Sequence, residues 1–476
     1  MLTQHLSAPT LVIGSGPGGA IAAAELQKNG QQVLIVEEGI GYDQKRLKPY
    51  SLSEMLRLYR NGGITTTFGN PAIKYVEGSC VGGGSEINSG MYYRTPVDII
   101  DIWRDSYRVM DFTEQSLEPH FIDCEARVNV CYMPGDLPLS SLKLLEGANN
   151  LGWDCNEIPR WFRYDDKPNP NPTEGVRQSM SETYLQDFVG DGGKIISGFK
   201  VFGIKRRRQA WQAIGRYQDG TQLRISADRI IVAAGAIQTP AILRRSGFTK
   251  NIGNNLKIHT TAKVIAQFEE VINSETTGVP VHQIREFAPA QSFGCAVSTP
   301  AYLRLGLLDN PDFKEDIAEV WRNMASYYVM ISGGKGVIRS LAPLRDPLVW
   351  YRLDRSNLIN LALGLKRLSK VLFRAGAVKV YPSIRGFNGL AGESEIHKMP
   401  NILNRSTASL MTIHLMGSCP MGEDRTKTAV DSYGQVHGAP GLFVSDASLI
   451  GNELGVNPQG TVMALARRNA HGLLDR

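Results

Sequence analysis

Cysteine is scarce in this sequence, and no two cysteines form a C-x-x-C pair. Six cysteines are spread over 476 residues: Cys80, Cys124, Cys131, Cys155, Cys295 and Cys419. This pattern argues against a zinc ribbon, a thioredoxin-like redox centre and a disulfide scaffold. We therefore expect free thiols in a reducing compartment and no metal site.

Long apolar runs, a signal-peptide pattern and a large charge of one sign are also missing. Residues Met1 to Thr10 lack a basic segment followed by an apolar one, and no stretch approaches the ~18 uncharged apolar residues of a membrane span. We expect a cytoplasmic protein, with peripheral contact to a membrane surface left open. The net charge of +6 is small for this length, so a nucleic-acid partner is not expected.

Glycine, by contrast, is abundant and clustered. The chain has 49 glycines in 476 residues, about one in ten against an average near 7%. The first cluster, with Gly14, Gly16 and Gly19, follows a buried-strand pattern and precedes an alanine-rich helix pattern. A second strand pattern ends at Glu37. Glycines at this spacing allow a tight turn, close approach to a pyrophosphate and close helix packing, and an acid at this place binds ribose hydroxyls.

Three further segments extend this unit into a discontinuous α/β domain. A loop over 78–91 holds Gly82, Gly83 and Gly84, too many glycines for a helix or strand interior and suited to backbone contact with a ligand. Residues 228–247 predict a strand, a small-residue turn and a helix, and 441–447 repeat the strand and turn before a helix pattern from Pro458.

The less glycine-rich stretches predict a second domain inserted into the first. We expect a Rossmann-type nucleotide-binding domain from residues 1–100, 191–264 and 405–476. An α+β substrate domain with an antiparallel sheet is expected from 101–190 and 265–404. Within it, 357–375 is an amphipathic pattern, which we interpret as a surface helix packed on the core rather than a membrane-binding helix.

Several ordered blocks together resemble the glucose–methanol–choline (GMC) family of FAD-dependent oxidoreductases. Besides the first glycine cluster, they are 82–88, 235–247, 252–259, 414–422 and 446–457. The triple-glycine loop and the ungapped 446–457 block are most similar to the cholesterol oxidase and long-chain alcohol oxidase-like members.

The resemblance implies bound FAD and assigns residues to it. The implied cofactor contacts are Gly14, Gly16, Gly19, Glu37, Gly83, Gly84, Asn88, Met91, Val201, Asp446, Ala447 and Pro458. Ile87 stands where some relatives carry a histidine that is covalently attached to the flavin, so we expect non-covalent FAD.

By the same resemblance, His414 matches the catalytic histidine and Asn457 its partner. Oxidation of an alcohol requires loss of the hydroxyl proton and hydride transfer to flavin N5, and a neutral imidazole is a suitable proton acceptor at pH 7. The Asn457 amide can donate to the developing alkoxide. His259 and Cys419, which lie in or beside family blocks, are interpreted as packing residues.

The expected function is oxidation of a CH–OH group to a carbonyl, with a bulky or apolar alcohol favoured as substrate. The alternatives are oxidation of a sugar or amino-sugar alcohol and a non-redox hydroxynitrile-lyase-like activity. The electron acceptor, whether oxygen, a quinone or a redox protein, stays open, as does the choice between oxidase and dehydrogenase.

Overall fold

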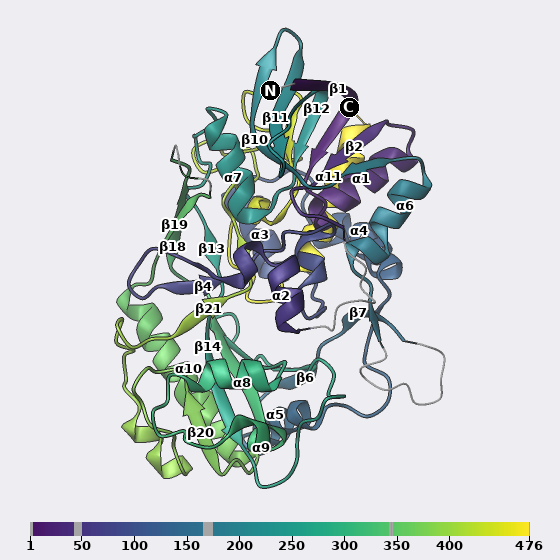
Figure 1. Cartoon of the computed structure of the whole chain (residues 1–476). Helices are drawn as coiled ribbons and strands as arrows, with labels where there is room; N and C mark the ends of the chain where they lie inside the picture. The colour runs from purple at the N-terminus through teal and green to yellow at the C-terminus, as the bar shows by residue number, and fades with distance from the viewer. Residues whose placement is uncertain (1–2, 42–49, 165–174, 342–343, 345, 476) are drawn as a thin grey trace.

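The computed structural model describes residues 3–41, 50–164, 175–341, 344 and 346–475. Two large sheets lie at opposite ends of the molecule, with both chain termini at the end of the first sheet (Figure 1). The first sheet has seven strands, in the order β10-β11-β12-β1-β2-β9 with β23 beside β12. They are β1 (Thr3–Ile13), β2 (Val33–Val36), β9 (Lys194–Ile196), β10 (Phe199–Arg207), β11 (Ala210–Tyr217), β12 (Gln222–Val232) and β23 (Leu442–Val444).

The centre of this sheet is parallel, and helices cover its strands, as crossover connections between parallel strands require. Strand β1 pairs in parallel with β2 and β12, and β12 pairs in parallel with β23. In β1, residues Leu11, Val12 and Ile13 are almost fully buried, as continuous apolar runs in parallel sheets usually are. The covering helices are α1 (Pro17–Lys28), α11 (Gln459–Leu474), α4 (Glu114–Arg127), α6 (Tyr184–Gly190) and α7 (Gly235–Arg245).

The second sheet has nine mostly antiparallel strands. They are β3 (Thr65–Thr66), β4 (Ile73–Tyr75), β6 (Cys155–Glu157), β14 (Thr260–Gln267), β15 (His282–Ile284), β16 (Gln291–Ala296), β17 (Met324–Ile331), β20 (Lys379–Pro382) and β21 (Leu410–Thr412). One face of this sheet packs on α10 (Arg355–Arg374) and α5 (Leu139–Asn149), and alternate residues of β14 and β17 form that core.

Helix α10 confirms the predicted surface helix. Asp354 and Asn357 form a capping box at its start, and the leucine stripe from Leu358 to Leu372 is buried against the sheet. No helix among the described residues is long and apolar enough to cross a membrane.

The remaining elements are mostly short. The remaining helices are α2 (Leu52–Leu58), α3 (Val97–Ser106), α8 (Pro300–Leu307) and α9 (Ile317–Val320). Three small sheets comprise β5 (Val130–Cys131), β7 (Arg160–Arg163) and β8 (Val176–Arg177); β13 (Lys257–Ile258) and β22 (Leu415–Met416); and β18 (Lys335–Arg339) and β19 (Leu348–Arg352).

The fold class matches the expected discontinuous Rossmann-type domain with an inserted antiparallel sheet, but the packing differs from the expected division for some strands and helices. Strands β3, β4 and β21, expected in the nucleotide-binding domain, belong to the nine-stranded sheet. Helices α4 and α6, expected in the substrate domain, pack on α11 and α1 of the seven-stranded half. Their apolar faces join the core of that half, which glycine content along the chain does not reveal.

Candidate active site

A cavity of about 480 Å³ runs between the two sheets and brings most of the sequence-predicted site residues together. Its lining includes all of the predicted cofactor and catalytic residues except Gly19. Gly19 instead lies in the first turn of α1, where a Cβ would collide with the carbonyl of Gly14, so its role is close packing of helix on strand.

Two glycine loops meet at one end of the cavity. Gly83 approaches Gly16 so closely that a Cβ on Gly83 would lie 2.8 Å from the Gly16 Cα. A Cβ on Gly84 or on Gly235 would meet no protein atom within 4 Å, although both residues line the cavity. The backbone thus forms a cradle, and the adjacent N-terminus of α1 offers free amides and a positive dipole end. This arrangement fits a diphosphate-containing dinucleotide.

Glu37 lies buried at the end of β2, where three donors hold its carboxylate. The Ser15 amide and hydroxyl donate to it at 2.9 and 2.8 Å, and the Gly39 amide donates at 2.8 Å. Burial raises the pKa of Glu37, and these hydrogen bonds oppose the rise. The Ser15 hydroxyl also accepts from the Gly82 amide at 3.1 Å, so Glu37 helps to join the two glycine loops.

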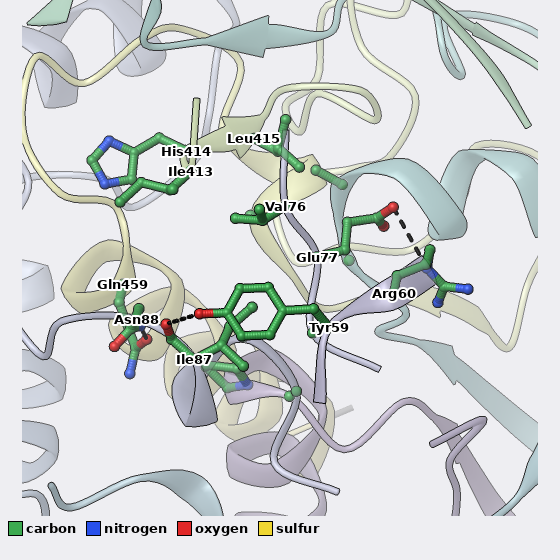
Figure 2. Close-up of a pocket in the computed structure, with 18 of the residues that line it drawn as sticks. Tyr59, Arg60, Val76, Glu77, Ile87, Asn88, Ile413, His414, Leu415 and Gln459 are labelled. Atoms are coloured by element: carbon green, nitrogen blue, oxygen red, sulfur yellow. Dashed lines mark hydrogen bonds and ion pairs between the residues drawn. The ribbon is translucent and has the colours of Figure 1, made fainter. Parts of the chain in front are cut away.

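Charged residues beside Val201 form an ion-pair network, in which Lys200 also reaches Asp346 at 3.6 Å. The Glu38 carboxylate lies 3.0 Å from Arg60 and 2.6 Å from Lys200, and Arg60 also reaches Glu77 at 3.5 Å (Figure 2). Burial alone would raise the pKa of Glu38, but Arg60 and Lys200 lower it to about 2. The charges at this end of the cavity are therefore compensated within the protein.

Side-chain hydrogen bonds brace the other predicted cofactor residues. Asp446 accepts from the Gly235 amide at 2.9 Å, the Thr239 hydroxyl at 2.5 Å and the Ser448 amide at 2.8 Å. Asn88 donates to Gln459, the first residue of α11, at 2.6 Å, and the two side chains lie side by side in Figure 2. These contacts fix the turns that line the cavity.

The two predicted catalytic residues lie close together in the cavity wall. His414 follows β21 and Asn457 precedes α11, and both side chains are buried. The Asn457 Nδ2 lies 3.4 Å from the His414 Nε2. Burial lowers the pKa of His414 to about 4, so the imidazole is neutral at pH 7.

A second histidine contacts His414, which sequence reasoning did not anticipate. His259, between β13 and β14, places its Nδ1 2.9 Å from the His414 Nδ1, with the rings nearly perpendicular. The Gly455 amide donates to the His259 Nε2 at 3.1 Å. Burial, reinforced by His414, keeps the pKa of His259 well below its usual range. Its block, 252–259, was identified in the sequence, but nothing in it indicated which residue it would meet.

A buried glutamine supports Asn457 from the second sheet. The Nε2 of Gln283, on β15, donates to the Asn457 Oδ1 at 3.4 Å and to the Tyr328 hydroxyl at 2.9 Å. The Tyr93 hydroxyl donates to the Gln283 Oε1 at 2.9 Å. This network reaches from both halves of the molecule and holds the amide beside His414.

The cysteines are buried or partly buried, and Cys295 lines the cavity. All six cysteines are free thiols, and Cys419 is fully buried, with its thiol pKa raised chiefly by burial. The described residues contain no group of three or more His, Cys, Asp or Glu side chains placed to hold a metal ion.

Comparison with known proteins relates both halves of the chain to one family. Residues 55–261 match the N-terminal model of the GMC oxidoreductases, and residues 338–466 match the C-terminal model. A GMC-type oxidoreductase of Sinorhizobium fredii is 38% identical over 99% of this chain and 95% of its own length.

Relatives with a named activity are more distant. A long-chain-alcohol oxidase of Arabidopsis thaliana is 26% identical over 96% of this chain and 66% of its own length. A cholesterol oxidase of Mycobacterium tuberculosis is 22% identical over 97% of this chain and 90% of its own length. Among solved structures, a pyridoxine 4-oxidase from "Mesorbium loti" superimposes with a TM-score of 0.75 at 19% identity, covering 98% of this chain and 99% of that one. That likeness concerns the fold.

Proposed function

Because this chain belongs to the GMC oxidoreductase family, and is therefore an FAD-dependent oxidoreductase of the alcohol-oxidising kind, we propose that it oxidises a bulky, largely apolar alcohol at His414 and Asn457. The observation that carries this proposal is the buried His414–Asn457 contact in the wall of the cavity that both glycine loops line. FAD, when bound, accepts the hydride from the alcohol carbon.

The proposed cofactor residues divide by function along the cavity. Gly14, Gly16 and Gly83 allow the backbone to approach the diphosphate, and Glu37 and Val201 lie at the nucleoside end. The lining residues Gly84, Asn88, Met91, Asp446, Ala447 and Pro458 would surround the flavin end. Ile87 offers no atom for a covalent link, so the cofactor would be held without one.

The substrate hydroxyl would bind between the His414 Nε2 and the Asn457 amide. A neutral imidazole there can take the hydroxyl proton, and a neighbouring amide can stabilise the developing negative charge. The adjoining cavity wall is mostly apolar, with Met55, Val279, Met330, Met411 and Ile413 among its residues. This lining, together with the named activities of the relatives, supports an alcohol with an apolar body.

The His259 contact places a condition on this proton transfer. The Gly455 amide can only donate, so the His259 Nε2 accepts and its Nδ1 carries the hydrogen that faces the His414 Nδ1. Neutral His414 therefore holds its own proton on Nε2 in the resting pair. The Asn457 amide can turn over to present its oxygen if the Gln283 amide turns over with it. The Tyr93 and Tyr328 hydroxyls that contact Gln283 allow this, since a hydroxyl can donate or accept.

For Nε2 to act as the base, the pair must adopt the opposite tautomer. His414 then donates from Nδ1 to His259, and the His259 Nε2–H faces the Gly455 amide. Leaving the buried Gly455 amide unpaired costs about 1–3 kcal/mol. This cost lowers the population of the productive tautomer by a factor of about 5–150. General bases typically accelerate a reaction by about 10²–10⁴-fold. Over most of this range the acceleration exceeds the tautomer cost, so base catalysis by His414 still gives a net gain in rate.

The function is tested by mixing the purified holoenzyme anaerobically with long-chain alcohols, sterols, sugars and choline and recording flavin bleaching. We expect bleaching by one or more alcohols with an apolar body. Bleaching by sugars alone would contradict the substrate class. An unbleached flavin with every alcohol, together with cyanide release from a cyanohydrin, would replace the redox function by a lyase. Admitting air afterwards distinguishes an oxidase, whose flavin reoxidises rapidly, from a dehydrogenase.

A further inference from the structure

The face of the nine-stranded sheet that looks into the cavity carries a lysine without an acidic partner. Lys263 lies on β14, and its cross-strand neighbour on β17 is Tyr328. Both line the cavity, as do Thr261 on β14 and Met330 on β17. Because side chains alternate along a strand, Ala262 and Val264 point the other way, into the core beneath α10.

The charge of Lys263 is uncompensated, unlike the charges at the nucleoside end of the cavity. No carboxylate of the described residues lies within 4.0 Å of its ammonium group, and the acids lining the cavity (Glu37, Glu38, Glu77 and Asp446) all come from segments outside the strands of this sheet. The nearby ionisable group is another cation, Lys74 on β4. Burial, reinforced by Lys74, lowers the pKa of Lys263 to about 8. At pH 7 the ammonium form still predominates by about ten to one.

The strand register places this charge at a distance from the proposed reaction centre. Thr261 faces Met411 of β21, and Met411 faces Lys74 of β4, so the two lysines share the cavity-facing side of the sheet. His259, which contacts His414, lies four residues before Lys263. At about 3.3 Å per residue, their Cα atoms are roughly 13 Å apart. The methionine-lined wall lies between.

We propose that Lys263 binds an anionic group, a carboxylate or a phosphate, at the far end of the substrate alcohol. This inference rests on the proposed function, in which His414 and Asn457 hold the hydroxyl. The substrate class is then an alcohol with an apolar body, a hydroxyl at one end and an anion at the other. An unpaired cation in a cavity wall attracts anions and forms charge-assisted hydrogen bonds with them.

The test compares matched ligands on the holoenzyme. Flavin reduction is followed anaerobically with an alkan-1-ol, the ω-hydroxycarboxylate of equal chain length and the corresponding ω-hydroxyalkyl phosphate. Binding is measured separately from the flavin difference spectrum produced by decanoate, which has no hydroxyl to oxidise. The variants are Lys263→Met and, as a control, Lys370→Met on α10, which removes the same charge from a helix covering the opposite face of the sheet.

We expect Lys263→Met to raise the ratio of the apparent Kd for the anionic alcohol to that for the neutral alcohol by about 10–100-fold, the size of a charge-assisted hydrogen bond. Decanoate binding should weaken by a similar factor, and Lys370→Met should change neither quantity. The anion whose binding depends more strongly on Lys263 identifies the natural group. Unchanged ratios and unchanged decanoate binding in Lys263→Met would overturn the inference. Decanoate binding that depends on Lys263 without bleaching by any alcohol would instead retain the anion site and refute the proposed function.

Discussion

Gly84 offers a sharp test of where the flavin lies, because adding one methyl group there should disturb the cofactor and nothing else. A Cβ at Gly84 meets no protein atom within 4 Å, and the backbone of this residue is not in the left-handed region. Gly84→Ala should therefore fold without strain and should stabilise the flavin-free protein by about 0.4–1 kcal/mol, since alanine has fewer unfolded conformations.

The same methyl group would occupy space that the proposed site gives to the flavin. Forcing one extra methyl into a filled site costs about 1–3 kcal/mol. The Kd for FAD should then rise by about 5–150-fold. Fluorescence titration of the flavin-stripped protein measures this Kd, and thermal unfolding without FAD measures the stability.

Gly190 supplies the matched control, because it is exposed at the end of α6 and a Cβ there also meets no atom. Gly190→Ala should give a similar small gain in stability with an unchanged Kd for FAD. The reasoning would be refuted by a Gly84→Ala protein that binds FAD as tightly as the wild type and the Gly190→Ala protein do.

Further predictions concern the histidine pair and the mode of cofactor attachment. His259→Asn, whose amide oxygen can accept from the His414 Nδ1, removes the contact that holds the His414 proton on Nε2. This variant should reduce the flavin faster than the wild type, by up to about 5–150-fold, the cost of the tautomer exchange; a slower variant would contradict the coupling. Because the His414 pKa is about 4, the rate constant for flavin reduction should stay flat from pH 8 to pH 5 and fall below that, and a midpoint near 6.5 would contradict the burial argument. Because the His414 pKa is lower in the folded chain than in the unfolded one, the unfolded state binds more protons between about pH 6.5 and 4. Acidification through this window should therefore lower the thermal stability of the wild type more than that of His414→Gln. Acid precipitation should release the yellow cofactor into the supernatant, and colour kept in the pellet would contradict the expectation drawn from Ile87.

The sequence sufficed for the family, the cofactor and the fold class because backbone constraints are local. A dinucleotide-binding turn needs glycines such as Gly14 and Gly16 within a few residues of each other. The strand before them and the helix after them make the pattern recognisable in the sequence. The later βα unit at Gly235 is recognisable for the same reason. The α/β fold was predicted on this basis, and the family and FAD were predicted from the resemblance of the ordered blocks; all three are confirmed.

The residues around the reaction centre could not be read in the same way, because their partners are far apart in the chain. His259 meets His414 across 155 positions, and Gln283 meets Asn457 across 174. In the sequence, Lys263 resembles any lysine on a strand. Only the strand register and the cavity lining show that it shares the cavity-facing side with Tyr328, and none of the described acids pairs with it. Strands β3, β4 and β21 were expected in the nucleotide-binding domain, and they join the other sheet because β21 pairs with β14, at Thr261 and Met411, far apart in the chain.

The central claim is that His414 takes part in oxidising the alcohol, and the most direct test is the rate constant of anaerobic flavin reduction in His414→Ala. The measurement uses an alcohol that bleaches the wild-type flavin, and the absorbance spectrum verifies that the variant retains FAD. The account predicts a rate constant lower by about 10–10³-fold with the cofactor still bound, because the tautomer cost reduces the usual general-base contribution. Reduction at the wild-type rate would contradict it.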